Sequence, residues 1–235
     1  MAVSRLWSPA PHQPLRKLES NLWVAEAPVP DAPYAQRMTL VRRRDTRVLV
    51  HNPICLNLAA MRDVDGWGPV TWLIVSCEAQ LAHLAAWVER YPLAKVISTS
   101  ALAVRTAAVA RVDGQIDALP VDDDMKMERL QGCPGEGVLL VRSAGRWTAV
   151  FADAVTNIPH LAGLRWSVER LLGLSGGPRV SRMFRLRAVK DRQAFRKHLE
   201  RLAETGNFAR LVPCHGDMVE GDGAAAALRQ AALSV

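Results

Sequence analysis

The sequence predicts an α/β protein built on mixed sheets. Two apolar segments near its start, residues 36–43 and 47–53, are separated by only three polar residues, a spacing suited to a β-hairpin. Later segments alternate between strand-like and helix-like apolar patterns, which is typical of strands joined by helices. Hairpins followed by such alternation favour mixed sheets over a doubly wound parallel sheet.

The first half contains this hairpin and one strand–helix–strand unit. Residues 21–27 form a further strand candidate, and the short apolar run TWLIVS at 71–76 predicts a buried central strand. Residues 80–91 have apolar side chains at the helical period, and Pro92 ends that helix. The segment 94–98 is the next predicted strand.

The second half repeats the order of a strand pair and then helices, whereas residues 100–135 between the halves have no clear pattern. Residues 191–206 predict a helix in which Asp191 is the N-cap and Gly206 follows the last turn. The other predicted elements are strands at 137–142, 146–154, 182–189 and 209–213, and helices at 160–173 and 223–233.

Composition limits the cellular setting. No apolar run approaches the length of about eighteen residues that a membrane span needs. The first twenty residues lack the continuous apolar core of a secretory signal, so we expect a cytoplasmic protein with no membrane partner. Residues 1–18 carry three prolines and predict an extended arm ahead of a single domain over 19–235.

Several common functional motifs are missing from the sequence. No G-x-G-x-x-G follows a predicted strand and no G-x-x-x-x-G-K-[ST] occurs, which argues against an enzyme with a nucleotide cofactor. No serine lies in a G-x-S-x-G turn. The four cysteines are widely spaced without a C-x-x-C pair, so we expect free thiols and neither a disulfide framework nor a zinc ribbon.

The positive charge is concentrated in residues 165–201, which hold eleven arginines and lysines but three acids, a local excess of +8. One interpretation is an anion- or nucleic-acid-binding surface on which Trp166, Phe184 and Phe195 stack bases. The other is a solvated, arginine-rich face. Nothing in the sequence identifies an oligomeric interface, although a dimer is compatible with it.

Four segments, in order along the chain, resemble the metallo-β-lactamase superfamily. They are RMTLVRRRDTRVLVHNPICL at 37–56, VTWLIVSCEAQLAHLAAWVERYPLAKV at 70–96, VFADAVTNIP at 150–159 and LVPCHGDMVEGD at 211–222. More narrowly, HNP at 51–53, FADAVTNIP at 151–159, PRVSRMFRL at 178–186 and CHGDMVEGD at 214–222 together resemble a metallo-hydrolase-like branch of that superfamily. The resemblance implies a four-layer α/β/β/α sandwich of two mixed sheets, with the site at one edge of the sheets. It also places His215 at the family's last imidazole ligand and Asp153 at its carboxylate ligand.

The sequence departs from the family at its strongest metal motif. Where the family has H-x-H-x-D-H, this chain reads SCEAQLAH at 76–83, and residues 84–152 contain no histidine. The usual dinuclear zinc site therefore cannot be built. What remains is at most a mononuclear Zn, Mn or Fe site formed by Asp153, His215 and His83, with Cys77 or Glu78 as a fourth ligand, or no metal at all.

Three functions follow from these residues. The first is a metal-dependent hydrolase acting on an ester, lactone, thioester or phosphoester, in which Asp217 or Glu78 is the base or orients another group. The second is a non-catalytic relative that binds a small molecule or a protein partner in the old cleft. The third is nucleic-acid binding through residues 165–201.

If the segment before His215 is a strand, Cys214 is expected to point away from that histidine.

The remaining histidines have structural interpretations. We expect His51, at a strand end, to form a hydrogen bond across the cleft, and we also consider for His83 an outward orientation or a bond to a backbone carbonyl. His160 and His198 are expected to be structural or solvated.

Overall fold

The computed structural model describes residues 7–163, 166–205 and 207–235. The chain divides into two compact units. The N-terminal unit consists of Met1–Pro30 and Ala35–Pro120, and the C-terminal unit consists of Asp31–Tyr34 and Val121–Val235.

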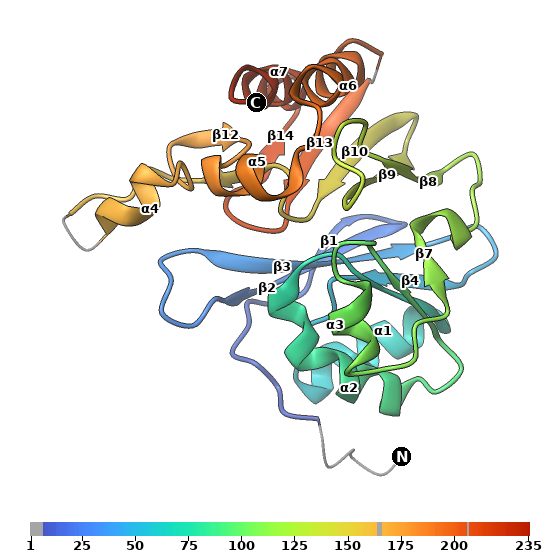
Figure 1. The fold of residues 1–235 in the computed structure, drawn as a ribbon. Coiled ribbons are helices and arrows are strands. Elements are labelled where there is room, and N and C mark those ends of the chain that lie inside the picture. The colour runs from blue at the N-terminus through green and yellow to red at the C-terminus, as the bar shows by residue number, and fades with distance from the viewer. Residues whose placement is uncertain (1–6, 164–165, 206) are drawn as a thin grey trace. The chain divides into compact units, whose positions relative to one another are not determined.

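The described part of the N-terminal unit forms a seven-stranded mixed sheet whose strands follow their order in the chain (Figure 1). Neighbouring strands from β1 to β4 are antiparallel, and those from β4 to β7 are parallel. The strands are β1 (Arg16–Glu19), β2 (Leu22–Pro28), β3 (Ala35–Arg42), β4 (Val48–His51), β5 (Val70–Val75), β6 (Lys95–Ser98) and β7 (Gly114–Gln115). The last residues of the expected N-terminal arm thus pair with β2 as an edge strand.

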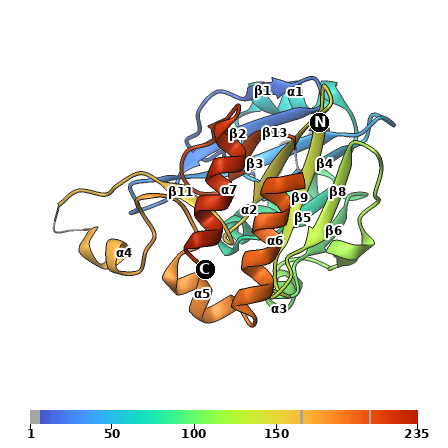
Figure 2. The same ribbon diagram turned by 90° about the horizontal axis from the view of Figure 1, so that it is seen from above.

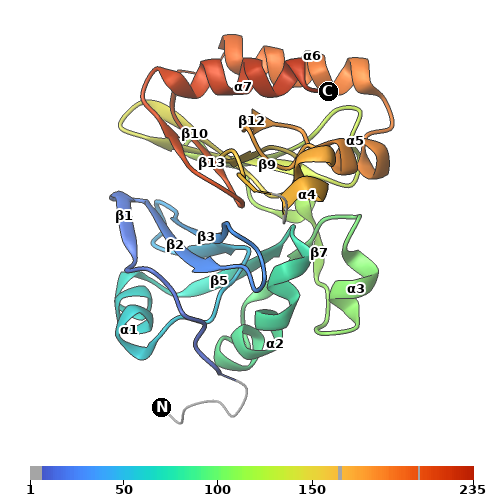
Figure 3. The same cartoon turned by 90° about the vertical axis from the view of Figure 1, so that its left-hand side faces the viewer.

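Helices α1 (Leu58–Trp67) and α2 (Leu81–Arg90) cover one face of this sheet (Figure 3). Their apolar side chains form one core with those of β3, β4 and β5, because alternate residues such as Leu73 and Val75 of β5 point to the same face. The central strand β5 is almost entirely buried, as expected for an apolar strand between parallel neighbours.

Helix α1 is an element that the sequence pattern did not predict. Charged residues and Gly66 interrupt its apolar side chains. The helix begins because the side chain of Asn57 accepts a hydrogen bond from the amide of Ala60 at 2.9 Å. The region without a clear pattern contains the short helices α3 (Ala103–Ala107) and η2 (Ile116–Ala118), and the turn η1 (Glu78–Gln80) precedes α2.

The described part of the C-terminal unit contains a five-stranded mixed sheet with the order β14-β13-β10-β9-β8. Its strands are β8 (Met125–Arg129), β9 (Gly137–Ser143), β10 (Arg146–Phe151), β13 (Phe208–Pro213) and β14 (Val219–Glu220). Strands β10 and β13 are parallel and the other pairs are antiparallel. A separate pair consists of β11 (Thr156–Ile158) and β12 (Gly177–Arg179).

Helices α6 (Arg192–Thr205) and α7 (Gly223–Leu233) lie side by side over β10 and β13 of this unit (Figures 1 and 2). They bury one apolar core against the sheet. The predicted N-cap of α6 is confirmed, since the amide of Ala194 donates to Oδ1 of Asp191 at 3.0 Å. The predicted role of Gly206 lies outside the described residues.

Two predictions for the C-terminal unit are wrong. The segment 182–189 is not a strand but helix α5 (Arg182–Ala188), because the hydroxyl of Ser181 caps it by accepting from the amide of Phe184 at 3.1 Å. Its partial alternation of basic and apolar residues imitates a strand. The helix expected over 160–173 is reduced to α4 (Ser167–Leu171). Gly173 has φ +69°, the conformation that allows glycine to follow a last turn.

All four cysteines are buried free thiols. In the part of the chain that the structure describes, no helix has the length and apolar character required to cross a bilayer.

Candidate functional site

Two parallel strands bring Asp153 and His215 together in the C-terminal unit. Phe151 at the end of β10 is the register partner of Pro213 at the end of β13, and each site residue lies two positions beyond its strand. The carboxyl ends of parallel strands meet at one edge of a sheet, so both side chains emerge there. Nε2 of His215 is 3.4 Å from Oδ1 of Asp153, with side chains 13% and 37% exposed.

The backbone around Asn157 holds this loop in place. The amide of Asn157 donates to the carbonyl of His215 at 3.1 Å, and the amide of Asp217 donates to the carbonyl of Asn157 at 2.8 Å. The side-chain amide of Asn157 also donates to the carbonyl of Asp217 at 2.8 Å. Gly216 has φ +89°, and a Cβ there would collide with the Asn157 carbonyl, so the close approach requires glycine.

Negative groups set the electrostatics of the imidazole. Burial lowers the pKa of His215, but the electrostatic influence of Cys214 and the hydrogen bonds and charge of Asp153 and Cys214 together raise this pKa well above its ordinary value. The ring of Tyr34 contacts the imidazole edge-on, with centroids 5.6 Å apart. The surroundings of His215 therefore favour the protonated imidazole.

A buried carboxyl group lies behind this pair. Glu136, directly before β9, is 5% exposed. Burial, and then the negative charges of Asp153 and Cys214, raise the pKa of Glu136 well above its ordinary value. Within the described residues its Oε2 has no hydrogen-bond partner. These influences favour the protonated form of Glu136.

The predicted orientation of Cys214 is wrong. A hydrogen bond joins the side chains of Cys214 and His215, and the Sγ atom lies within 4.8 Å of a ring nitrogen of His215. The prediction relied on the alternation of side chains in a strand, but β13 ends at Pro213 and Cys214 lies in a bend. In the C-terminal unit, the imidazole of His215 therefore has the thiol of Cys214 and the carboxylate of Asp153 as neighbours. Such a set of donors suits zinc or a similar divalent ion.

Asp217 follows on the same loop. Its side chain is exposed, and its backbone is held by Asn157 at both the amide and the carbonyl. The structure thus places Asp217 on the rim of the loop that carries His215.

The other predicted ligands belong to the N-terminal unit. Cys77 is buried two residues after the end of β5, and its amide donates to Oδ1 of Asn52 at 3.2 Å. Glu78 is exposed and forms an ion pair with Arg105. His83 lies on α2, where burial lowers its pKa. Its backbone carbonyl, rather than its ring, accepts a weak bond from the thiol of Cys55 at 3.9 Å.

His51 occupies the strand end expected for it. It is 2% exposed, and its Nε2 lies 3.0 Å from the hydroxyl of Ser76 at the end of the neighbouring β5. The predicted strand-end position is confirmed; the hydrogen bond to Ser76 joins neighbouring strands of one sheet, and the predicted bond across the cleft stays a prediction.

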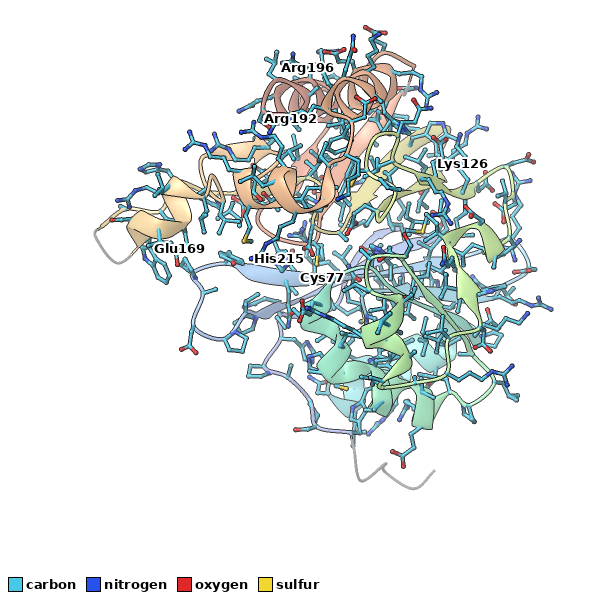
Figure 4. All side chains as sticks on the ribbon, in the orientation of Figure 1. Cys77, Lys126, Glu169, Arg192, Arg196 and His215 are labelled. Carbon is cyan, nitrogen blue, oxygen red and sulfur yellow. The ribbon has the colours of Figure 1, made fainter. Side chains whose placement is uncertain are left out.

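Many arginines of the basic segment bind backbone carbonyls of the C-terminal unit. Arg185 and Arg196 donate to the last carbonyls of α7, where a helix leaves acceptors unsatisfied and favours positive charge. Arg170 donates to the carbonyls of Leu161 and Gly163, both at 2.7 Å. Phe195 is fully buried in the core, so the prediction that it stacks bases is wrong. Figure 4 labels Arg192 and Arg196 of this segment on α6.

Sequence reasoning missed Glu136, Cys214 and Asn157 as parts of the site. No motif contains Glu136, which lies in a turn before a strand and approaches Asp153 only through the pairing of β9 with β10. The sequence offered one signal, the glycine after His215, since a glycine at a loop end often marks a close approach of backbones.

Known proteins share the fold but not the sequence. No protein-family model matches the sequence, and no curated protein matches it. A metallo-beta-lactamase from Pontibacter korlensis matches with a TM-score of 0.60 at 10% identity, covering 96% of this chain and 100% of its own. DIM-1 metallo-beta-lactamase exposed to ceftazidime matches with a TM-score of 0.63 at 10% identity, covering 96% and 99%.

A third structure is FIM-1 from Pseudomonas aeruginosa in its mono-zinc form, with a TM-score of 0.57 at 9% identity, covering 96% of each chain. These matches extend over nearly the whole chain, and they confirm the predicted α/β class with two mixed sheets. The chain has the metallo-β-lactamase fold.

Proposed function

We propose that this protein is a metal-dependent hydrolase with a reduced, at most mononuclear, metal site. The observation that carries the proposal is the ion pair of His215 and Asp153 at the ends of two paired parallel strands. Strand ends fix ligand positions, and imidazole and carboxylate are ligands of divalent metals in hydrolases. Cys214, whose thiol adjoins His215, is a third donor in the same unit.

When bound, such an ion would polarise a carbonyl or phosphoryl oxygen and lower the pKa of a water molecule. His215 and Asp153 would hold it, and the neutral Glu136 would keep a second negative charge away from the carboxylate of Asp153. Asp217, exposed on the same loop, is our candidate for the general base. The substrate class that we propose is an ester, lactone, thioester or phosphoester.

Metal content is the first test. We would incubate the purified protein with Zn, Mn or Fe, desalt it, and measure bound metal by elemental mass spectrometry. We expect about one equivalent in the wild type and none in His215→Ala or Asp153→Ala. His160→Ala is the matched control, since it removes an exposed imidazole from the same unit.

Retention of the metal by His215→Ala would contradict the proposed ligand. If the wild type takes up the metal, turnover of p-nitrophenyl esters, a lactone, a thioester and a phosphodiester follows. An Asp217→Asn variant that retains the metal but loses turnover would support Asp217 as the base.

A second candidate is a non-catalytic relative that has kept the fold. One observation favours it: His215 and Asp153 lie 3.4 Å apart, so a protonated imidazole and the carboxylate can neutralise each other directly. His198 is too remote from His215 to serve as a second imidazole ligand. It lies beside Glu128 of β8, and β8 is three strands from β13, a separation of roughly 14 Å at the usual strand spacing. A wild type that binds no metal while Asp153→Asn lowers its stability would support this function.

A further inference from the structure

Three aliphatic side chains are exposed on two neighbouring short helices of the C-terminal unit. Val168 and Leu171 of α4 are 62% and 68% exposed, and Leu186 of α5 is 74% exposed. Val168 and Leu171 are three positions apart and therefore lie on one side of α4. None of the three belongs to the candidate metal site. Solvent-exposed aliphatic residues that gather in one region mark an interaction surface more often than isolated ones do.

Two hydrogen bonds hold α4 against the start of α5. The amide of Arg182 donates to the carbonyl of Leu172 at 2.9 Å, and its guanidinium group donates to the carbonyl of Leu171 at 3.1 Å. Leu186 is one helical turn after Arg182, on the same side of α5. Figures 1 and 2 show the two helices next to each other, with α4 farther than α5 from the five-stranded sheet of this unit. We call Val168, Leu171 and Leu186 the α4–α5 patch.

The chain around this patch is strongly positive. Residues 166–192 contain seven arginines and lysines but two acids, a net charge of +5. None of the seven cations forms an ion pair with a carboxylate of the described residues. Arg170, Arg182 and Arg185 donate instead to backbone carbonyls, which hold a guanidinium group without neutralising its charge. The exposed cations of this segment are Arg182, Arg187, Lys190 and Arg192.

The two acids of the segment are turned to other uses. Glu169, labelled on α4 in Figure 4, has a buried Oε2 atom without a hydrogen-bond partner among the described residues. The carboxylate of Asp191 accepts from the amide of Ala194 and caps α6. The segment therefore presents aliphatic side chains together with positive charges that no neighbouring acid cancels.

This combination suits an anionic lipid surface better than a nucleic acid or a second copy of the chain. Bases stack on aromatic rings, but the exposed apolar side chains here are aliphatic, whereas Phe195 is buried and Phe184 packs against the core. A second copy would bring another segment of +5 to the same surface, and the two would repel each other. Anionic headgroups attract the cations, and the acyl boundary below them accepts aliphatic side chains.

We propose that the α4–α5 patch docks the protein on the surface of an anionic lipid bilayer. Val168, Leu171 and Leu186 enter the boundary between headgroups and acyl chains, and Arg182 and Arg187 pair with lipid phosphates. Apolar insertion and charge together give the two contributions that stable peripheral binding requires. The expectation of no membrane partner rested on the lack of a membrane span, and peripheral docking needs no span.

The test is co-sedimentation of the full chain with lipid vesicles. One set contains phosphatidylcholine alone, and the other contains equal parts of phosphatidylcholine and phosphatidylglycerol. We expect binding to the anionic vesicles and at least about tenfold weaker binding to the neutral ones, because each cation near an anionic surface strengthens binding about fivefold. High salt should weaken the binding to anionic vesicles.

Variants then separate the two contributions. Leu171→Ser and Val168→Ser should each weaken binding about fivefold or more, because an aliphatic side chain no longer leaves water. Arg187→Gln should weaken it about fivefold. The matched controls are Val104→Ser, at a side chain of α3 that is 85% exposed, and Arg62→Gln, at an exposed arginine of α1. Both controls belong to the N-terminal unit and should bind as the wild type does.

A fluorescent label tests where the protein touches the lipid. Leu171→Cys and, as its control, Val104→Cys are labelled with nitrobenzoxadiazole, since the four native thiols are buried. We expect the emission of the label at position 171, but not at position 104, to shift to shorter wavelength and brighten when anionic vesicles are added. A matching response at both positions would contradict docking through α4.

Three further results would overturn the proposal: no binding to the anionic vesicles at low salt, equal binding to neutral vesicles, or undiminished binding of both Leu171→Ser and Val168→Ser. A single-stranded RNA is titrated in parallel by fluorescence anisotropy. RNA binding without vesicle binding would assign the positive segment to nucleic acid and also overturn the proposal. The patch shares no residue with the His215–Asp153 site, so the outcome is independent of whether the protein is a hydrolase.

Discussion

His215 and Asp153 form an ion pair of 3.4 Å between Nε2 and Oδ1, although they are separated by sixty-one residues of sequence. The pair exists because Phe151 and Pro213, two positions earlier in each case, are register partners in parallel strands. Its stability therefore depends on the protonation of the imidazole.

We predict that the metal-free protein loses stability as the pH rises. The folded pKa of His215 is raised above the ordinary value of 6.5, so its contribution is complete below that pH and is lost as the pH passes through the folded value. Asp153→Asn lowers the folded pKa, and each unit of lowering removes about 1.4 kcal/mol of this contribution. Urea unfolding of both proteins between about pH 5 and pH 9 measures it; an unchanged pH dependence in the variant would contradict the coupling.

Glu136 adds a second dependence of stability on pH, with the same sign as that of His215. Its pKa is raised in the folded state, so folding keeps a proton that the unfolded chain releases above the ordinary value of 4.5. Stability therefore falls as the pH rises from there towards the folded value. We expect Glu136→Gln to match the wild type near pH 4 and to be more stable near pH 8. Glu204→Gln, an exposed glutamate on α6, should leave the slope unchanged, and an equal slope for both variants would refute the assignment.

We predict that Gly216→Ala destabilises the protein by more than the left-handed backbone conformation at this position alone would cost. A left-handed backbone costs an alanine about 1–2 kcal/mol, and at this position the new methyl group also collides with the Asn157 carbonyl. Gly221→Ala is the matched control, because Gly221 has φ +67° but open space around it. Denaturation midpoints compare the two variants. If Gly216→Ala costs no more than Gly221→Ala, the close approach of the backbones is not required.

We predict that Phe195 stabilises the hydrophobic core and does not bind a ligand. Phe195→Ala should lower the free energy of unfolding by about 3–5 kcal/mol, as expected for the loss of a buried aromatic ring. Leu186→Ala, at a side chain 74% exposed, should change it by less than about 0.5 kcal/mol. Thermal or urea unfolding distinguishes them. If Phe195→Ala changed the free energy of unfolding only slightly, Phe195 would again be a candidate for stacking on nucleic-acid bases.

The sequence by itself determined the class of the fold and two residues of the site. Apolar periodicity predicted β3, β4, β5 and α2, and the order of motifs predicted a metallo-β-lactamase fold. These signals are local, because a strand or an amphipathic helix has a repeat that a short window contains. Asp153 and His215 were singled out by the resemblance of their segments, VFADAVTNIP and LVPCHGDMVEGD, to that family.

Only the tertiary structure decided what surrounds those two residues. Glu136 and Asn157 reach the site through strand pairing and loop contacts across 17 to 58 residues of sequence, which no local pattern encodes. Cys214 turned towards His215 because β13 ends one residue before it, and a strand end is set by its hydrogen bonds and not by its composition. The helix α5 at 182–188 was decided in a similar way: the side-chain hydrogen bond from Ser181 caps its start and outweighs an ambiguous pattern.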